Sequence, residues 1–173
     1  MLPPLTLVLG GAASGKSAYA EDLVAETGQA RVYLATAEAH DAEMVEKLAR
    51  HRRRRGPDWR TVEAPRDLGP ALEGAARSEV VLLDCATMWL SNHLLAENDL
   101  EQAETALLGA LDRCAAPVVM VSNEVGLSVV PENALARRFQ TAQGRLNQTL
   151  AARADVVMQV IAGLPQILKG HLP

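Results

Sequence analysis

Short, nearly continuous apolar runs alternate along the chain with longer segments in which apolar residues recur every three to four positions. The runs are typical of strands buried on both faces, whereas the periodic segments are typical of helices with one face packed on a sheet. We expect strands over 5–9, 31–35, 59–63, 80–84, 117–122 and 155–161, and helices over 16–26, 41–52, 68–76, 87–96, 100–114 and 134–153. This alternation predicts an α/β fold with a mainly parallel sheet and helices on both faces.

The first expected strand runs directly into a glycine-rich loop. Its residues fit the phosphate-binding pattern GxxxxGK[ST] in full: Gly10, Gly11, Ala12, Ala13, Ser14, Gly15, Lys16 and Ser17. In such a P-loop, backbone N–H groups point into one concavity, the lysine bridges the β- and γ-phosphates, and the hydroxyl ligates Mg²⁺. The alternative is a glycine turn that binds nothing. With the strand before it and the helix after it, the motif predicts a P-loop NTPase-type, RecA-like domain.

Asp84 closes a run of four apolar residues and is the second candidate for the nucleotide site. A carboxylate at the tip of a buried strand can hold Mg²⁺ directly or through water. It can also simply cap the helix that follows.

Other candidate residues follow expected strands at the sheet edge where ligands bind in open α/β folds. Thr36, Ala37 and Glu38 come after the second strand. Asn123 and Glu124 come after the fifth, where substrate contact and simple turn formation explain them about equally well.

A basic cluster, Arg50 to Arg55, contains five arginines around His51. No aromatic residue is interleaved, so a platform for single-stranded nucleic acid is poorly supported. Arginine pairs readily with phosphate oxygens, and a positive field keeps the imidazole neutral at neutral pH. His51 is therefore either a ligand contact or a nucleophile that forms a phosphoramidate.

Composition limits the remaining possibilities. The 173 residues fit one catalytic domain, 1–173, and the net charge of −4 argues against a general nucleic-acid partner. No apolar run approaches the roughly 20 residues needed to cross a bilayer, so we expect no stable membrane insertion. Cys85 and Cys114 lack metal-site spacing, and we expect buried, reduced thiols in a cytoplasmic protein.

Taken together, these motifs resemble the bifunctional adenosylcobinamide kinase/adenosylcobinamide-phosphate guanylyltransferase of cobalamin biosynthesis. The resemblance covers nearly the whole chain. It rests on the P-loop, His51 in its arginine cluster, WRTVE at 59–63, DCATMWLSN at 84–92, SNEVG at 122–126, VPEN at 130–133 and GRLNQ at 144–148.

The resemblance implies two reactions on one pathway intermediate. In the first, ATP or GTP gives its γ-phosphoryl group to the aminopropanol hydroxyl of adenosylcobinamide. In the second, His51 attacks the α-phosphate of GTP, and adenosylcobinamide phosphate then takes the GMP from the histidine. The resemblance also implies a homotrimer and a nucleotide-binding set made of Gly10 to Ser17, Thr36, Ala37, Glu38, Arg52, Arg53, Arg54, Arg55, Glu63 and Asp84. Within this set we expect Lys16 to be catalytic with His51, and Ser17 and Asp84 to hold Mg²⁺.

The chain departs from the family pattern at three positions. Ala13 stands where arginine is frequent, Ala86 where a larger aliphatic residue is usual, and Ser128 where glycine is common. The missing P-loop arginine bears on the kinase reaction more than on guanylyl transfer. Two other hypotheses stay open: a monofunctional P-loop small-molecule kinase, and a non-catalytic nucleotide-binding regulator.

Overall fold

A seven-stranded sheet forms the centre of the molecule, which a computed structural model describes over residues 1–38, 46 and 56–172. The strands are β1 Leu5–Gly10, β2 Ala30–Ala35, β3 Trp59–Glu63, β4 Glu79–Asp84, β5 Val118–Asn123, β6 Val156–Ile161 and β7 Leu164–Lys169. The helices are α1 Lys16–Ala25, α3 Gly69–Glu73, α4 Ala86–Leu95, α5 Leu100–Arg113 and α6 Ala134–Arg153. The strand order is β3-β2-β4-β5-β1-β6-β7, and every pairing except β6 with β7 is parallel.

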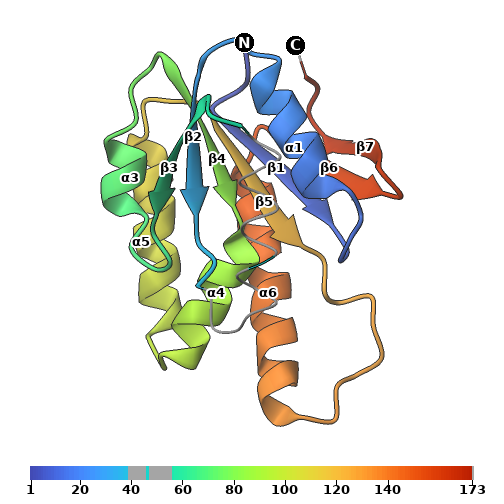
Figure 1. The fold of residues 1–173 in the computed structure, drawn as a ribbon. Coiled ribbons are helices and arrows are strands. Elements are labelled where there is room, and N and C mark those ends of the chain that lie inside the picture. Colours follow the sequence, from blue (N-terminus) through green and yellow to red (C-terminus); the bar gives the residue numbers. More distant parts are fainter. Residues whose placement is uncertain (39–45, 47–55, 173) are drawn as a thin grey trace.

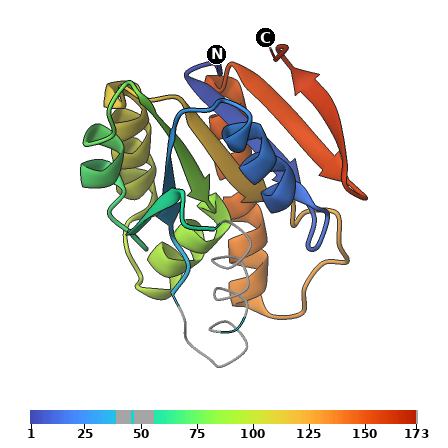
Figure 2. The ribbon, with the colours of Figure 1, turned by 45° about the horizontal axis from the view of Figure 1, so that its top comes forward.

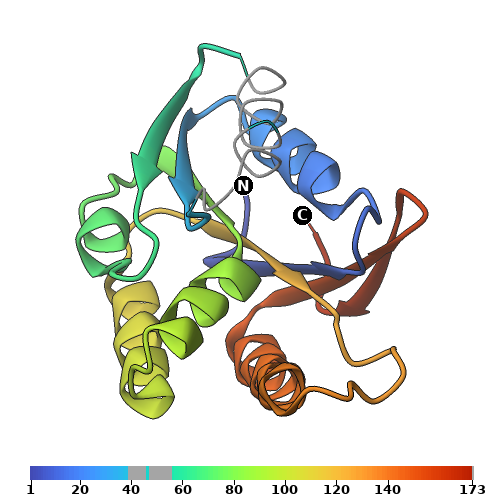
Figure 3. The same ribbon diagram turned by 60° about the horizontal axis from the view of Figure 1, so that its bottom comes forward.

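Helices cover both faces of this sheet, as the apolar runs predict. In β4, Val80 and Leu82 pack on the α1 face, while Val81 and Leu83 pack toward α3, α4, α5 and α6. Successive residues of a strand point to opposite faces of the sheet. Because helices cover both faces, all four side chains are buried. Figure 3, seen from the carboxyl ends of the strands, shows α1 on one side of the sheet and α3, α4, α5 and α6 on the opposite side.

The strand order determines which loops surround the P-loop. β5 lies between β1, which leads into the P-loop, and β4, which ends at Asp84. The carboxyl ends of these three parallel strands therefore lie at one edge, at the bottom of Figure 1, and the two chain termini lie together at the opposite edge.

The expected elements over the described residues are confirmed, with ends shifted by a few residues. The expected helix over 41–52 falls mostly outside the described residues.

Sequence reasoning missed β7. This strand forms an antiparallel hairpin with β6, visible at the right of Figure 2. The signal was the two-residue link Ala162-Gly163, in which both residues have positive φ, 52° and 78°, as tight hairpin turns require. The strand itself was not predicted because it contains Pro165 and because all six of its residues are exposed, so its sequence lacks the pattern of a buried strand.

One expectation about the core was wrong. The spacing of Leu135, Phe139, Ala142, Leu146 and Leu150, three to four residues apart in the sequence, predicts one long buried stripe on α6, but Leu135 is 47% exposed. Leu146 and Leu150 lie in the core, because the second half of α6 packs on the sheet. The first half projects beyond the carboxyl ends of the strands (Figure 1) and has no sheet beneath it.

Among the described residues, no helix is long and apolar enough to cross a membrane. Both cysteines are free, but only Cys85 is fully buried, and Cys114 is partly exposed.

Candidate functional site

The P-loop adopts a backbone that only glycine permits at two positions. A Cβ on Gly10 would lie 2.4 Å from Ser14 Oγ and 2.8 Å from the Val160 carbonyl oxygen. Gly15 has φ 93° and closes the loop at the start of α1. Lys16 is buried, and its Nζ donates to the Gly11 carbonyl at 3.1 Å, so the amine lies across the loop. Ser17 occupies the first turn of α1 and is partly exposed.

The β6–β7 hairpin supports this loop from the side. The Gly163 N–H donates to the Ser14 carbonyl at 2.8 Å, and a Cβ on Gly15 would approach the Gly163 Cα to 3.1 Å. Ala13 is exposed and has φ 54°. The missed hairpin is thus part of what holds the P-loop in shape.

Asp84 ends β4 without capping the next helix. The N-cap of α4 is Cys85, whose Sγ accepts the Met88 N–H at 3.4 Å, so the helix-cap alternative for Asp84 is wrong. Tyr33 Oη instead donates to Asp84 Oδ2 at 3.0 Å. Burial, with a smaller effect of the Asp84 charge, raises the pKa of the Cys85 thiol to about 11 and keeps it protonated.

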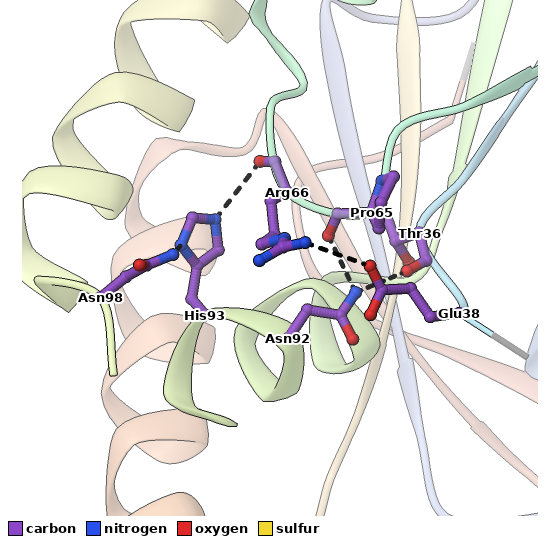
Figure 4. A network of polar contacts seen from close by, with 7 residues as sticks. All are labelled: Thr36, Glu38, Pro65, Arg66, Asn92, His93 and Asn98. Atoms are coloured by element: carbon purple, nitrogen blue, oxygen red, sulfur yellow. Dashed lines mark hydrogen bonds and ion pairs between the residues drawn. The ribbon is translucent and has the colours of Figure 1, made fainter. Parts of the chain in front are cut away.

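At the end of β2, the polar groups of Thr36 are committed to the protein itself. Its hydroxyl donates to the Cys85 carbonyl at 2.8 Å and accepts the Cys85 N–H at 2.7 Å. Asn92 Nδ2 donates to the Thr36 carbonyl at 2.7 Å and to the Pro65 carbonyl at 2.9 Å (Figure 4). A nucleotide contact in this segment therefore falls to Ala37 or Glu38 rather than to the Thr36 hydroxyl.

Glu38 continues this edge toward the outer strand. Its carboxylate lies 3.5 Å from Arg66 Nη2, and His93 contacts the Arg66 carbonyl from α4 (Figure 4). Glu63 ends β3 next to Ala35 and is exposed. A groove of about 880 Å³ lies beyond Arg66, between α3, α4 and α5, and its lining includes no residue of the P-loop.

His51 and Arg52 to Arg55 lie outside the described residues. The structure brings the P-loop, Asp84 and the segment 36–38 to one edge of the sheet, but it does not place the histidine relative to them.

The end of β5 carries a buried polar network that sequence reasoning did not identify. Ser122 Oγ donates to Asn147 Oδ1 at 2.7 Å, and Gln143 Nε2 lies within hydrogen-bond distance of both residues. Asn147 Nδ2 donates to the Asn123 carbonyl at 3.0 Å, and the Asn123 N–H donates to Thr87 Oγ1 at 2.8 Å. The available signal was the pair Gln143 and Asn147, two amides one turn apart on the face of α6 that also carries Leu146 and Leu150.

Comparisons with known proteins identify the family. Residues 6–168 match the family model described as cobinamide kinase / cobinamide phosphate guanyltransferase. The chain belongs to this family. The match covers the P-loop, Asp84, the β5 end and most of the hairpin.

Relatives support the family match over more than nine tenths of both chains. The bifunctional adenosylcobalamin biosynthesis protein CobP of Pseudomonas aeruginosa is 46% identical over 168 residues, covering 95% of this chain and 97% of that protein. CobU of Salmonella typhimurium, with the same description, is 42% identical over 92% of this chain and 97% of its own length.

Among solved structures, an ATPase of a bacterial type III secretion system superposes with a TM-score of 0.56 at 11% identity. The match covers 96% of this chain and 58% of that one. This likeness concerns the fold alone. Together with the strand order, it confirms the expected P-loop, RecA-like fold.

Proposed function

We propose that this protein phosphorylates adenosylcobinamide with ATP or GTP and then transfers GMP from GTP to the product, giving adenosylcobinamide-GDP in cobalamin biosynthesis. Family membership over residues 6–168 carries this proposal. The complete P-loop supports it physically, because one phosphate-binding loop can hold the triphosphate for either transfer.

The residues around the P-loop suit the chemistry of the first reaction. Lys16 would offset the charge that develops on the transferred phosphoryl group. Ser17 and Asp84 offer the oxygen ligands that Mg²⁺ prefers, and α1 packs against β4, the strand that ends at Asp84. Mg²⁺ held by Ser17 and Asp84 would supply positive charge that offsets part of the negative charge of the phosphate groups.

The second reaction depends on His51 as the nucleophile. A neutral imidazole nitrogen would attack the α-phosphate of GTP and release pyrophosphate, and the phosphate of adenosylcobinamide phosphate would then displace the histidine. We assign Arg52 to Arg55, Glu63 and the segment 36–38 to nucleotide binding on the family pattern.

Incubation of the purified protein with α-labelled GTP tests this assignment. We expect an acid-labile, base-stable label on the wild type, none on His51→Ala, and normal phosphorylation of adenosylcobinamide by His51→Ala. Lys16→Ala is expected to lower that phosphorylation by about 1,000-fold, since it removes a charge that stabilises the transition state.

Other results would favour the competing hypotheses. Kinase activity with no covalent label would indicate a monofunctional kinase. Nucleotide binding with neither activity, accompanied by RNA affinity that falls steeply with salt, would indicate a regulator.

We also propose a homotrimer in the cytoplasm. Large apolar side chains stay exposed on the β5–α6 connection, at Leu127, Val129 and Val130, and burial between subunits would remove them from water. Light scattering of the purified protein measures the assembly directly.

A further inference from the structure

A second cavity lies directly against the P-loop, on the side away from the groove beyond Arg66. It measures about 530 Å³ and is bounded by P-loop residues 11–14, the start of the β5–α6 connection and the end of β6. Most of its lining is apolar, including Val125, Leu127 and Ile161. Among the described residues that line it, Glu124 is the one with an ionisable side chain.

Glu124 is held in place beside the first residue of the P-loop. Asn123 pairs with Gly10 in the sheet, and the Glu124 N–H donates to the Gly10 carbonyl at 3.0 Å. One carboxylate oxygen, Oε1, accepts the Gly126 N–H at 2.6 Å. A Cβ on Gly126 would lie 2.8 Å from that oxygen, so the carboxylate is packed closely onto the glycine.

The strand order puts the end of β5, which Glu124 directly follows, between the P-loop and the Asp84 end of β4. β5 separates β1 from β4, so Glu124 follows a strand that lies between the P-loop and Asp84. A triphosphate held by Lys16 and by a cation at Asp84 would have its γ-phosphoryl group near the end of β5.

We propose that this cavity receives the hydroxyl-bearing arm of the kinase acceptor and that Glu124 is the general base for its phosphorylation. The inference rests on the proposed function. The hydroxyl oxygen forms the new bond to the γ-phosphorus, the bond from that phosphorus to the β–γ bridging oxygen breaks, and the nucleoside diphosphate leaves with the electron pair. The hydroxyl proton passes to the Glu124 carboxylate. The apolar lining suits the methyl and methylene groups of an aminopropanol arm.

The two reactions place different demands on such a base. An alcohol must lose its proton as it attacks, whereas the phosphate acceptor of the second reaction is already an anion. Glu124 is therefore needed for the first reaction only. A glutamate that served only to form the turn would not discriminate between them.

Glu124→Gln separates these roles, because the amide oxygen can still accept the Gly126 N–H but cannot take a proton. We expect the kcat for phosphorylation of adenosylcobinamide to fall about 100- to 10,000-fold, the usual range for loss of a general base. The KM for the nucleotide should stay within about threefold of the wild type. Guanylyl transfer, assayed with adenosylcobinamide phosphate supplied directly, should be unchanged.

Two further variants keep the test specific. Gly126→Ala retains the carboxylate but displaces it, and we expect a smaller fall confined to the kinase reaction. Glu132→Gln removes an exposed carboxylate from the same connection and should leave both reactions at the wild-type rate.

Full kinase activity in Glu124→Gln, or equal loss of both reactions in a variant that unfolds at the wild-type temperature, would overturn this inference while leaving the proposed function standing. A wild-type protein with neither activity would overturn both. Thermal unfolding of each variant shows whether an equal loss comes from misfolding, and in that case the Gly126→Ala result decides.

Discussion

An asparagine from a helix holds the carboxyl end of β2, and another holds that of β5, but the two contacts differ in their surroundings. At β2, Asn92 of α4 donates to two backbone carbonyls and to no other side chain among the contacts described. At β5, Asn147 of α6 donates to the Asn123 carbonyl and also accepts from Ser122 and Gln143. The first contact fastens a strand end, whereas the second connects it to a buried network.

The comparison indicates which of the two strand ends is suited to hold a catalytic side chain. Beyond the β2 end, Glu38 is engaged with Arg66 at the boundary with the outer strand. Beyond the β5 end, Glu124 faces a cavity that the P-loop also lines. The network holds both backbone polar groups of Asn123, the residue directly before Glu124, although Asn123 Oδ1 and Gln143 Oε1 have no hydrogen-bond partner themselves. These backbone contacts suit the network to fixing the position of Glu124.

The largest effect is expected for Asn147→Leu, a change of similar shape that removes every hydrogen bond of the amide. It takes the Asn147 amide from the partly buried Asn123 carbonyl and one partner from Ser122 and Gln143, which should lower the free energy of unfolding by about 2 to 4 kcal/mol. It should also lower the kinase kcat by about 10- to 100-fold, because Glu124 is no longer fixed relative to the P-loop. Urea unfolding and steady-state assays measure the two effects.

Guanylyl transfer serves as the internal control for this variant. If it fell as far as phosphorylation, the network would support the whole fold rather than the β5 end.

A smaller effect, on stability alone, is expected for Asn92→Leu. The Thr36 and Pro65 carbonyls would lose their partner, at a cost of about 1 to 3 kcal/mol in the free energy of unfolding. For a chain of this size each kcal/mol corresponds to about 2 to 4 °C in Tm. The ratio of the two activities should match the wild type, and a selective loss of phosphorylation would show that the two asparagine contacts are equivalent.

Features of the fold that depend on local sequence patterns could be predicted from the sequence. Strands buried on both faces and helices with one apolar face have strong local patterns, so β1, β4, β5 and the last half of α6 were predicted. The P-loop was predicted because its geometry requires glycine at Gly10 and Gly15.

The features that could not be predicted depend on contacts between residues that are far apart in the sequence. Gly163 supports Ser14 across 149 positions, and Asn147 reaches Asn123 across 24. Leu135 has helical periodicity, but the pattern does not tell whether a sheet lies beneath it. The segment 36–38 was placed correctly at the sheet edge, yet nothing in the sequence shows that the Thr36 hydroxyl bonds Cys85 rather than a ligand.

The smallest effect concerns Cys85, whose N–H and carbonyl both bond the Thr36 hydroxyl at the β2 end. Burial raises the pKa of this thiol from 9.0 to about 11, so the folded state holds its proton more tightly than the unfolded state does. The contribution of this thiol to the free energy of unfolding is therefore fully present below pH 9 and is lost as the pH rises toward 11. At pH 10 the loss is about 1 kcal/mol.

Cys85→Ser isolates this contribution, since serine does not titrate in this range and its hydroxyl can still cap α4. The free energy of unfolding, measured in urea at pH 8 and pH 10, should fall less in Cys85→Ser than in the wild type by about that amount. Tyr19 and Cys114, whose pKa values burial also raises, contribute equally to both proteins and cancel in the difference. An identical fall in both proteins would mean that the thiol at the β2 end exchanges its proton as readily as it does in the unfolded chain, and that the β2 end opens to water when its neighbours stay folded.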